Sequence, residues 1–224
     1  MSVMLYAILE RGDPLTDRGV LDGRALQAIE DDELVAVVGE AGRSATDAGG
    51  ARLWEYERVI EALMGERTLL PARFGSVFAD ATSVRASIRE HRAQLKDALR
   101  RVSGAVELAV SASARSDPPV TRDAGAGPGT AYMTGQLERW QRARRIAEAL
   151  EPLNALARAV QPRRSSDAGT LFGAAYLVDR DAVPRFVELL GRIDRGLEEA
   201  ELTCTGPWPP FSFAGQPLLQ EEGS

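Results

Sequence analysis

The sequence predicts an α+β protein of two domains, and three observations support that prediction. Short apolar segments typical of strands alternate with longer segments whose apolar residues follow helical spacing. A stretch rich in glycine, proline and serine, residues 113–129, separates two such series. A segment rich in proline and aromatic residues, Gly206–Phe213, follows the last predicted strand. We therefore expect domains at residues 1–112 and 130–224, with 113–129 as a flexible loop or linker.

The predicted first domain combines strands with amphipathic helices. Its expected elements are a strand at Val3–Leu9, a short helix at Leu26–Ile29, a buried strand at Leu34–Val38, a helix at Leu53–Met64, extended pieces in Leu69–Phe78, a helix at residues 83–102 and a strand at Ala105–Ala112. This number of strands and helices matches a ferredoxin-like unit with an extra helix.

The predicted second domain contains a long helix, which begins near Met133. Pro152 is expected to kink or restart this helix, because proline lacks the N–H that the helix needs. Strands are expected at Thr170–Val178 and Glu201–Thr205, with a helix after Asp181 between them. The extended tail rich in proline and aromatic residues completes this domain.

Composition excludes several classes of function. The chain has 27 basic and 33 acidic residues and a formal net charge of −6, which argues against a general nucleic-acid binder. One cysteine, Cys204, and one histidine, His91, can form neither a disulfide framework nor a Cys/His zinc cluster. The first residues lack a signal-peptide pattern, and no apolar run reaches about 18 residues. We expect a soluble, cytoplasmic protein with no cofactor, no metal and no catalytic residues.

Two charged segments are interpreted as surface features. Four consecutive acids, Glu30–Glu33, are expected to form a solvated acidic turn, because consecutive carboxylates rarely converge on one cation. The helix at residues 83–102 carries six basic side chains and is expected to present a solvated face or a patch for an acidic protein partner. RNA binding by this helix remains an alternative. His91 lies on the apolar stripe of the same helix and is expected to be a core or domain-interface residue.

An arginine stands inside the apolar segment LLPARFGSVF. Because an unpaired buried charge is costly, we expect Arg73 to pair with an acidic residue or to cap backbone carbonyls, while Phe74 packs inward.

The tail segment GPWPPFSF contains three prolines and three aromatic rings. We expect residues 206–213 to be extended and to lie against the C-terminal domain, with Trp208 substantially buried. The alternative is a free docking segment for another protein. The candidate structural or partner-contact residues are Arg73, Phe74, Trp208, Pro209, Pro210, Phe211 and Phe213.

Three sequence blocks together resemble the gas vesicle protein F/L family. They are LLPARFGSVF at Leu69–Phe78, GAAYLVDR at Gly173–Arg180, and TGPWPPFSF at Thr205–Phe213. Val3–Leu9 and Gly129–Met133 match weaker landmarks of the same pattern. The similarity spans nearly the whole chain in the family's order, and TGPWPPFSF is its most specific block.

The resemblance implies a two-domain protein with a ferredoxin-like N-terminal domain, serving as an accessory or minor structural component of gas vesicles, which provide buoyancy. It covers both F-type and L-type members. It implies a non-enzymatic role in vesicle assembly, with the small, very apolar shell protein and other accessory vesicle proteins as partners, and neither nucleic acid nor membrane. The alternative function is a ferredoxin-like small-molecule-binding or monooxygenase-like enzyme, because that fold hosts many activities.

Overall fold

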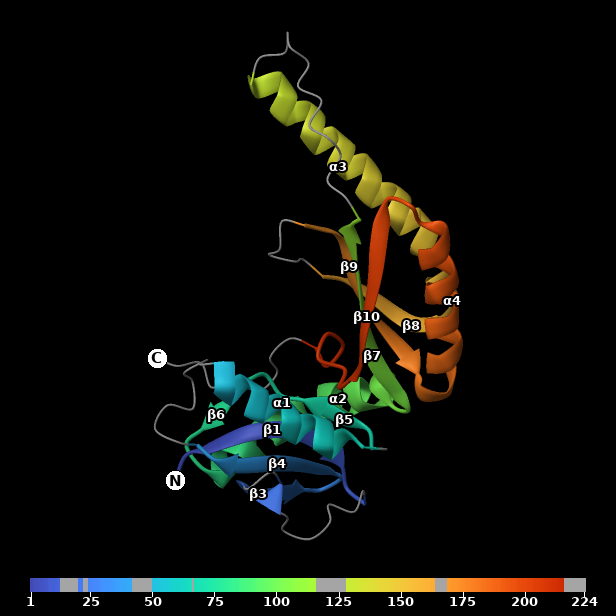
Figure 1. Ribbon diagram of the computed structural model, residues 1–224. Helices are drawn as coiled ribbons and strands as arrows, with labels where there is room; N and C mark the ends of the chain where they lie inside the picture. Colours follow the sequence, from blue (N-terminus) through green and yellow to red (C-terminus); the bar gives the residue numbers. More distant parts are fainter. Residues whose placement is uncertain are drawn as a thin grey trace. The chain divides into compact units, whose positions relative to one another are not determined.

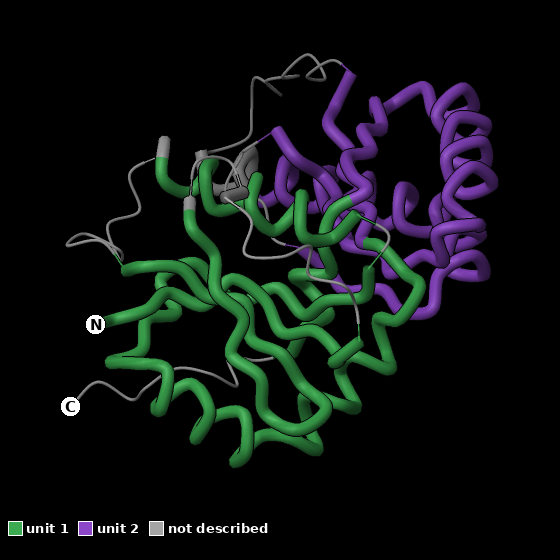
Figure 2. The backbone as a smooth tube through the Cα atoms, turned by 90° about the horizontal axis from the view of Figure 1, so that it is seen from below, with its two compact units in different colours: residues 1–106, 208–224 green, residues 107–207 purple. Residues whose placement is uncertain are grey.

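The chain has a mixed α+β fold, as the sequence predicts. The computed structural model describes residues 1–12, 20–21, 24–41, 50–65, 67–115, 128–163 and 169–215. The chain divides into two compact units, Met1–Val106 with Trp208–Ser224, and Glu107–Pro207 (Figure 2). The expected division placed the whole tail in the second domain, whereas the chain from Trp208 onward belongs to the first unit. Most of the expected linker lies outside the described residues.

The first unit is built on an antiparallel sheet. Its strands are β1 (Val3–Glu10), β2 (Val20–Leu21), β3 (Arg24–Asp31), β4 (Leu34–Glu40), β5 (Leu69–Pro71) and β6 (Val77–Phe78), and its helices are α1 (Gly50–Met64) and α2 (Ala81–Val102). The strand order is β2-β3-β4-β1-β5, and β6 also pairs with β1. The apolar runs of β1 and β4 are buried on both faces, as continuous apolar strands predict.

The short helix expected at Leu26–Ile29 is wrong, because this segment lies in β3. Its alanine, leucine and glutamine favour a helix locally, but β3 pairs antiparallel with β4 from Leu26 to Asp31. The hairpin turns at Asp32 and Glu33, where Asp32 adopts a positive φ of 57°. Pairing with a buried neighbour therefore overrides local propensity here.

The second unit has its own sheet and helices. Its elements are β7 (Ala105–Ala114, whose first two residues end the first unit), α3 (Pro128–Leu150), the 3₁₀ helix η1 (Glu151–Leu156), β8 (Ala157–Pro162), β9 (Thr170–Asp179), the 3₁₀ helix η2 (Arg180–Ala182), α4 (Val183–Gly196) and β10 (Ala200–Trp208). The strand order is β10-β7-β9-β8. α4 and the C-terminal part of α3 cover one face of this sheet (Figure 1). Tyr176 and Phe186 meet edge to face in its core, with ring centroids 5.1 Å apart.

The element order of the second unit corrects the expected position of the ferredoxin-like pattern. Apart from the 3₁₀ turns, the described elements of this unit follow one another as β-α-β-β-α-β, the order that a ferredoxin-like unit has. In the described part of the first unit, β1 to β4 follow one another before the first helix. The sequence interpretation failed because it took β3 for a helix and assigned β7 to the first domain.

The tail bends, contrary to the expectation of an extended segment. β10 runs through Trp208, and the chain then turns, with Phe211 N–H donating to Pro209 O at 2.7 Å and Phe213 N–H to Pro210 O at 3.0 Å. Pro209, Pro210 and Phe213 are buried, whereas Trp208 remains 36% exposed and Phe211 39%. Trp208 is therefore less buried than expected, and Phe213, three residues after the second buried proline, is the ring of the tail that is fully buried.

We predict that Phe213 stabilises the tail more than its neighbouring ring. Phe213 is 3% exposed, so Phe213→Ala should lower the free energy of unfolding by about 3–5 kcal/mol. Phe211→Ala is the matched control at an exposed position and should cost about 1 kcal/mol or less. Urea denaturation of both variants measures the difference; equal losses would contradict this assignment.

Candidate functional site

The segment between β5 and β6 is attached to β1 by backbone and hydroxyl hydrogen bonds. Leu5 N–H donates to Ser76 O at 2.9 Å, and Ala72 N–H donates to Tyr6 O at 2.8 Å. The hydroxyl of Tyr56 lies 2.9 Å from Ala72 O and 3.1 Å from Leu5 O. Burial raises the pKa of Tyr56 strongly, so the hydroxyl keeps its proton and remains a donor at physiological pH.

Arg73 and Phe74 lie in this segment, which contains Gly75 at a φ of +85°. Phe74 is half-buried and packs edge to face on Tyr56, with ring centroids 5.3 Å apart. Arg73 is exposed, and its guanidinium makes no hydrogen bond or ion pair with any other residue that the structure describes. The expected pairing of Arg73 is not found among the described residues, and its exposed position lowers the need for a partner, because water solvates the charge.

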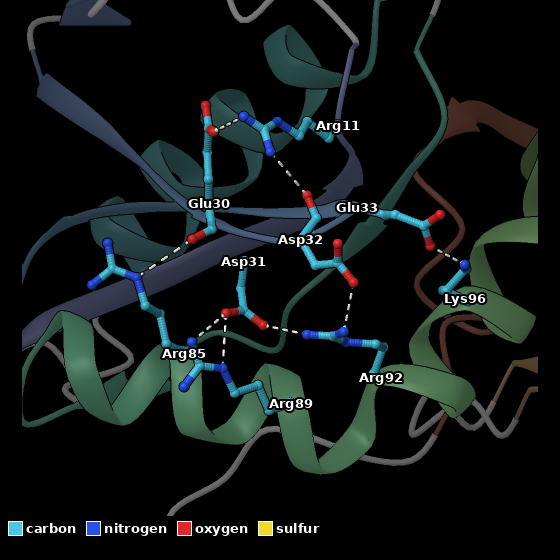
Figure 3. Close-up of polar contacts among 9 residues, drawn as sticks. All are labelled: Arg11, Glu30, Asp31, Asp32, Glu33, Arg85, Arg89, Arg92 and Lys96. Atoms are coloured by element: carbon cyan, nitrogen blue, oxygen red, sulfur yellow. Dashed lines mark hydrogen bonds and ion pairs between the residues drawn. The ribbon is translucent and has the colours of Figure 1, made fainter.

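The acidic turn and the basic helix are partners of each other (Figure 3). The buried Asp31 carboxylate, 7% exposed, accepts from Arg89 Nε at 2.9 Å and from Arg92 Nη2 at 2.6 Å. Arg92 also bonds Asp32 Oδ2 through Nη1 at 2.6 Å, and Lys96 pairs with Glu33. Glu30, Asp32 and Glu33 stay exposed, as expected of a solvated turn, whereas Asp31 is buried. The expectation of two independent surface features missed their pairing, because the β3–β4 hairpin places its turn against α2.

These pairs shift the pKa of two carboxyl groups. The hydrogen bond from Arg89 is the largest influence on Asp31, and together with Arg92 it lowers the pKa of this carboxyl against the opposing effect of burial. The hydrogen bond from Lys96 likewise lowers the pKa of Glu33. The cations that made α2 a candidate for RNA binding are therefore partly neutralised within the unit.

Helix α3 carries an apolar stripe on its exposed surface, formed by Met133, Leu137 and Trp140. These side chains are 69%, 54% and 60% exposed, and their spacing of four and three residues puts them on one helical face. The N-terminal part of α3 extends beyond the sheet of its own unit (Figure 1). Sequence reasoning included these residues in a single long helical pattern and missed that they face solvent.

The single histidine lies on α2 of the first unit, and the single cysteine lies on β10 of the second. The Nδ1–H of His91 donates to Ser87 O at 3.0 Å, one turn earlier in α2. Cys204 is half-buried, and burial raises the pKa of its thiol.

Among the described residues, no group of three His, Cys, Asp or Glu side chains could hold a metal ion. No helix within the described ranges is long and apolar enough to cross a membrane.

This mixed α+β fold with two antiparallel sheets is also the fold of solved gas vesicle proteins. GvpF from Anabaena sp. PCC7120 matches with a TM-score of 0.79 and 22% identity, covering 96% of both chains. GvpF from Microcystis aeruginosa matches with a TM-score of 0.77 and 22% identity, covering 96% of this chain and 99% of that one.

Sequence comparison identifies the family. The family model described as Gas vesicle synthesis protein GvpL/GvpF matches residues 2–215, and the chain belongs to this family. Gas vesicle protein L of a Streptomyces species is 28% identical, covering 94% of this chain and 92% of that protein. Gas vesicle protein F2 of Halobacterium salinarum is 24% identical, covering 93% of this chain and 89% of that protein. The resemblance inferred from the three sequence blocks is confirmed.

We predict that the buried carboxylate of Asp31 makes the stability of the protein acid-sensitive. Its folded-state pKa is lowered, so its contribution is present above the ordinary value of 3.8 and is lost as pH falls through the lowered pKa. Asp31→Asn should therefore reduce the melting temperature most near pH 7, and the gap to wild type should shrink below about pH 4. Thermal melts across this range measure it.

Asp32→Asn is the control, because it makes the same charge change at an exposed carboxylate that pairs with Arg92 alone among the residues described. Its effect on the melting temperature should be smaller than that of Asp31→Asn at every pH. A pH-independent gap for Asp31→Asn would show that packing, and not charge, is the source of the loss.

Proposed function

We propose that this protein binds the small apolar shell protein of gas vesicles and assists its assembly into the vesicle wall, as an accessory or minor structural component. Family membership supports a gas vesicle role, and the proposal adds the partner and the mode of action. A subunit that builds a wall facing gas exposes apolar surface before assembly, and such surface aggregates in water. A protein that covers this surface and then releases it needs a binding site but no catalytic centre.

The apolar stripe of α3 is the observation that carries this proposal. Large apolar side chains exposed together on one face are typical of interaction sites in proteins that otherwise remain in solution. Met133 supplies a flexible, polarisable side chain, and Trp140 supplies a wide ring, with the guanidinium of Arg144 5.9 Å from its centroid. This surface fits an apolar protein partner better than a polar small molecule.

The residues singled out in the sequence blocks are proposed as secondary contacts or supports. In the first unit, Arg73 offers an exposed cation, and Trp208 and Phe211 offer partly exposed rings. The buried Pro209, Pro210 and Phe213 hold the tail, and the half-buried Phe74 supports the segment that presents Arg73. The ferredoxin-like assignment, moved here to the second unit, does not by itself indicate a function, because that fold hosts many functions.

The proposal predicts that removing the stripe abolishes shell-protein binding without unfolding the protein. Met133→Gln, Leu137→Gln and Trp140→Gln together should reduce the shell protein retained by the tagged full-length chain by at least about tenfold. Glutamine is a good helix former, so the melting temperature should change little. Co-expression with the shell protein, followed by pull-down, measures retention.

Trp54→Gln is the matched control, because Trp54 is a tryptophan on α1 that is 68% exposed. It should leave retention within about twofold of wild type, as expected for residues outside the centre of an interface. Full retention by the triple variant would exclude the α3 stripe as the binding surface. Failure of the wild-type chain to retain any shell protein would refute the proposed function itself.

A further inference from the structure

The two edges of the second sheet are protected to different degrees. β8, at one edge, is six residues long, has an irregular register between Ala157 and Ala159, and carries Arg158 and Pro162. These are the devices by which proteins prevent a foreign strand from pairing with a sheet edge. β10, at the other edge, is nine residues long and carries a single charged side chain, Glu201, with its proline at position 207. The β10 edge is therefore the less protected one.

Side chains occupy the first part of the β10 edge. Asp194 Oδ1, from α4, accepts the N–H of Leu202 at 2.9 Å. Arg115 Nε donates to the carbonyl of Ala200 at 2.8 Å, and Arg115 Nη2 also bonds Asp194 Oδ1 at 3.0 Å. This ion pair satisfies the backbone groups of the strand's start and blocks pairing there.

The same contacts show which backbone groups point outward beyond the ion pair. The N–H and C=O of one residue point to the same side of a strand, and alternate residues repeat that side. Because the Leu202 N–H is bound by a helix side chain and not by β7, the Leu202 carbonyl and both backbone groups of Cys204 point to the outer edge. Gly206, with a φ of +118°, ends this regular stretch.

The side chains beside this stretch differ between the two faces of the sheet. Leu202 and Cys204 are partly buried and pack against the core of the second unit, together with Ile193 and Leu197 of the α4 segment. Thr203 and Thr205 are exposed. A strand added at this edge would place its apolar side chains beside Leu202 and Cys204 and its polar side chains beside the threonines.

We propose that the outer edge of β10, from the Leu202 carbonyl to the Cys204 carbonyl, accepts an extended segment of the shell protein with alternating apolar and polar residues as an added strand. This inference rests on the proposed function and names one contact through which it operates. Backbone hydrogen bonds would hold the added strand. The apolar side chains of Leu202 and Cys204 would favour a partner segment in which apolar and polar residues alternate.

A pair of substitutions at one residue tests the backbone contact. Cys204→Pro removes the outward N–H, and proline is tolerated where the N–H of an edge strand faces away from the sheet. Cys204→Val keeps the N–H and favours a strand. In the co-expression pull-down, Cys204→Pro should retain at least about tenfold less shell protein than wild type, and Cys204→Val should stay within about twofold.

Hydrogen exchange of the wild-type chain provides a second measurement that does not depend on the folding of the proline variant. On adding shell protein, the Cys204 amide should exchange at least about tenfold more slowly, while the β8 amides stay unchanged. Undiminished retention by Cys204→Pro, or no slowing at Cys204 in a complex that forms, would overturn this inference and leave the proposed function standing. Slowing that depends on the concentration of this chain alone would assign the edge to a second copy and overturn it too. A wild-type chain that retains no shell protein would refute the proposed function, and this inference with it.

Discussion

Strand β1 is the constraint on which the first unit depends. Its residues from Met4 to Leu9 are buried, and it pairs with β4 on one side and with β5 and β6 on the other. β5 and β6 leave Leu5 and Tyr6 unmatched between them, and the Ala72–Ser76 segment satisfies the backbone groups at this gap. Tyr56 joins α1 to the same point, because its hydroxyl reaches carbonyls of both β1 and that segment. The segment PARFG, residues 71–75, therefore has a structural role first, because it completes the hydrogen bonding along β1. Any role of the exposed Arg73 is additional to this one.

The second constraint in this unit is electrostatic. A buried carboxylate is costly unless charged partners surround it, and Asp31 has two arginines from α2. The hairpin turn and the helix therefore determine each other's charge pattern: four acids in succession on one, and a line of cations at helical spacing on the other. Arg11 extends the network, with Nη2 3.1 Å from Glu30 Oε2 (Figure 3). When the sequence is considered alone, the acidic turn and the basic helix look like independent solvated surfaces. The ion pairs between them join residues about 60 positions apart, and local sequence patterns do not predict contacts over such a separation.

The sequence predicts the fold where apolar patterns are strong and fails where tertiary contacts decide. The buried strands β1 and β4 follow from continuous apolar runs, and α2 follows from its stripe. β3 could not be predicted, since its composition favours a helix and only its pairing makes it a strand. The exposure of Arg73 depends on the conformation of the loop between β5 and β6. The apolar sequence around Arg73 does not predict that conformation.

The exposed stripe of α3 was detectable in principle. Six residues separate Trp140 from the buried Ile146, which corresponds to a rotation of about 240° around the helix. Residues up to Trp140 and residues from Ile146 onward therefore lie on different faces, and a single stripe cannot contain both. Only the second set can pack on the sheet, because the first part of α3 extends past it (Figure 1).

The two proposed contacts of the second unit differ in kind, and their strengths set the character of the binding. The β10 edge offers three outward backbone groups beyond the Arg115–Asp194 pair, and each hydrogen bond contributes about 0.5–1.5 kcal/mol net. Their sum is about 1.5–4.5 kcal/mol and only at its upper limit reaches the roughly 4 kcal/mol that corresponds to millimolar affinity, so strand pairing alone gives only transient binding. Burial of the α3 stripe adds about 25 cal/mol for each Å² of apolar surface removed from water, but with little directional preference. The stripe would thus supply affinity and the edge would supply register, and neither alone would hold a subunit tightly. Such a division suits a protein that must cover apolar surface and then yield it to a growing wall, because a partner that offers better burial can displace it from both.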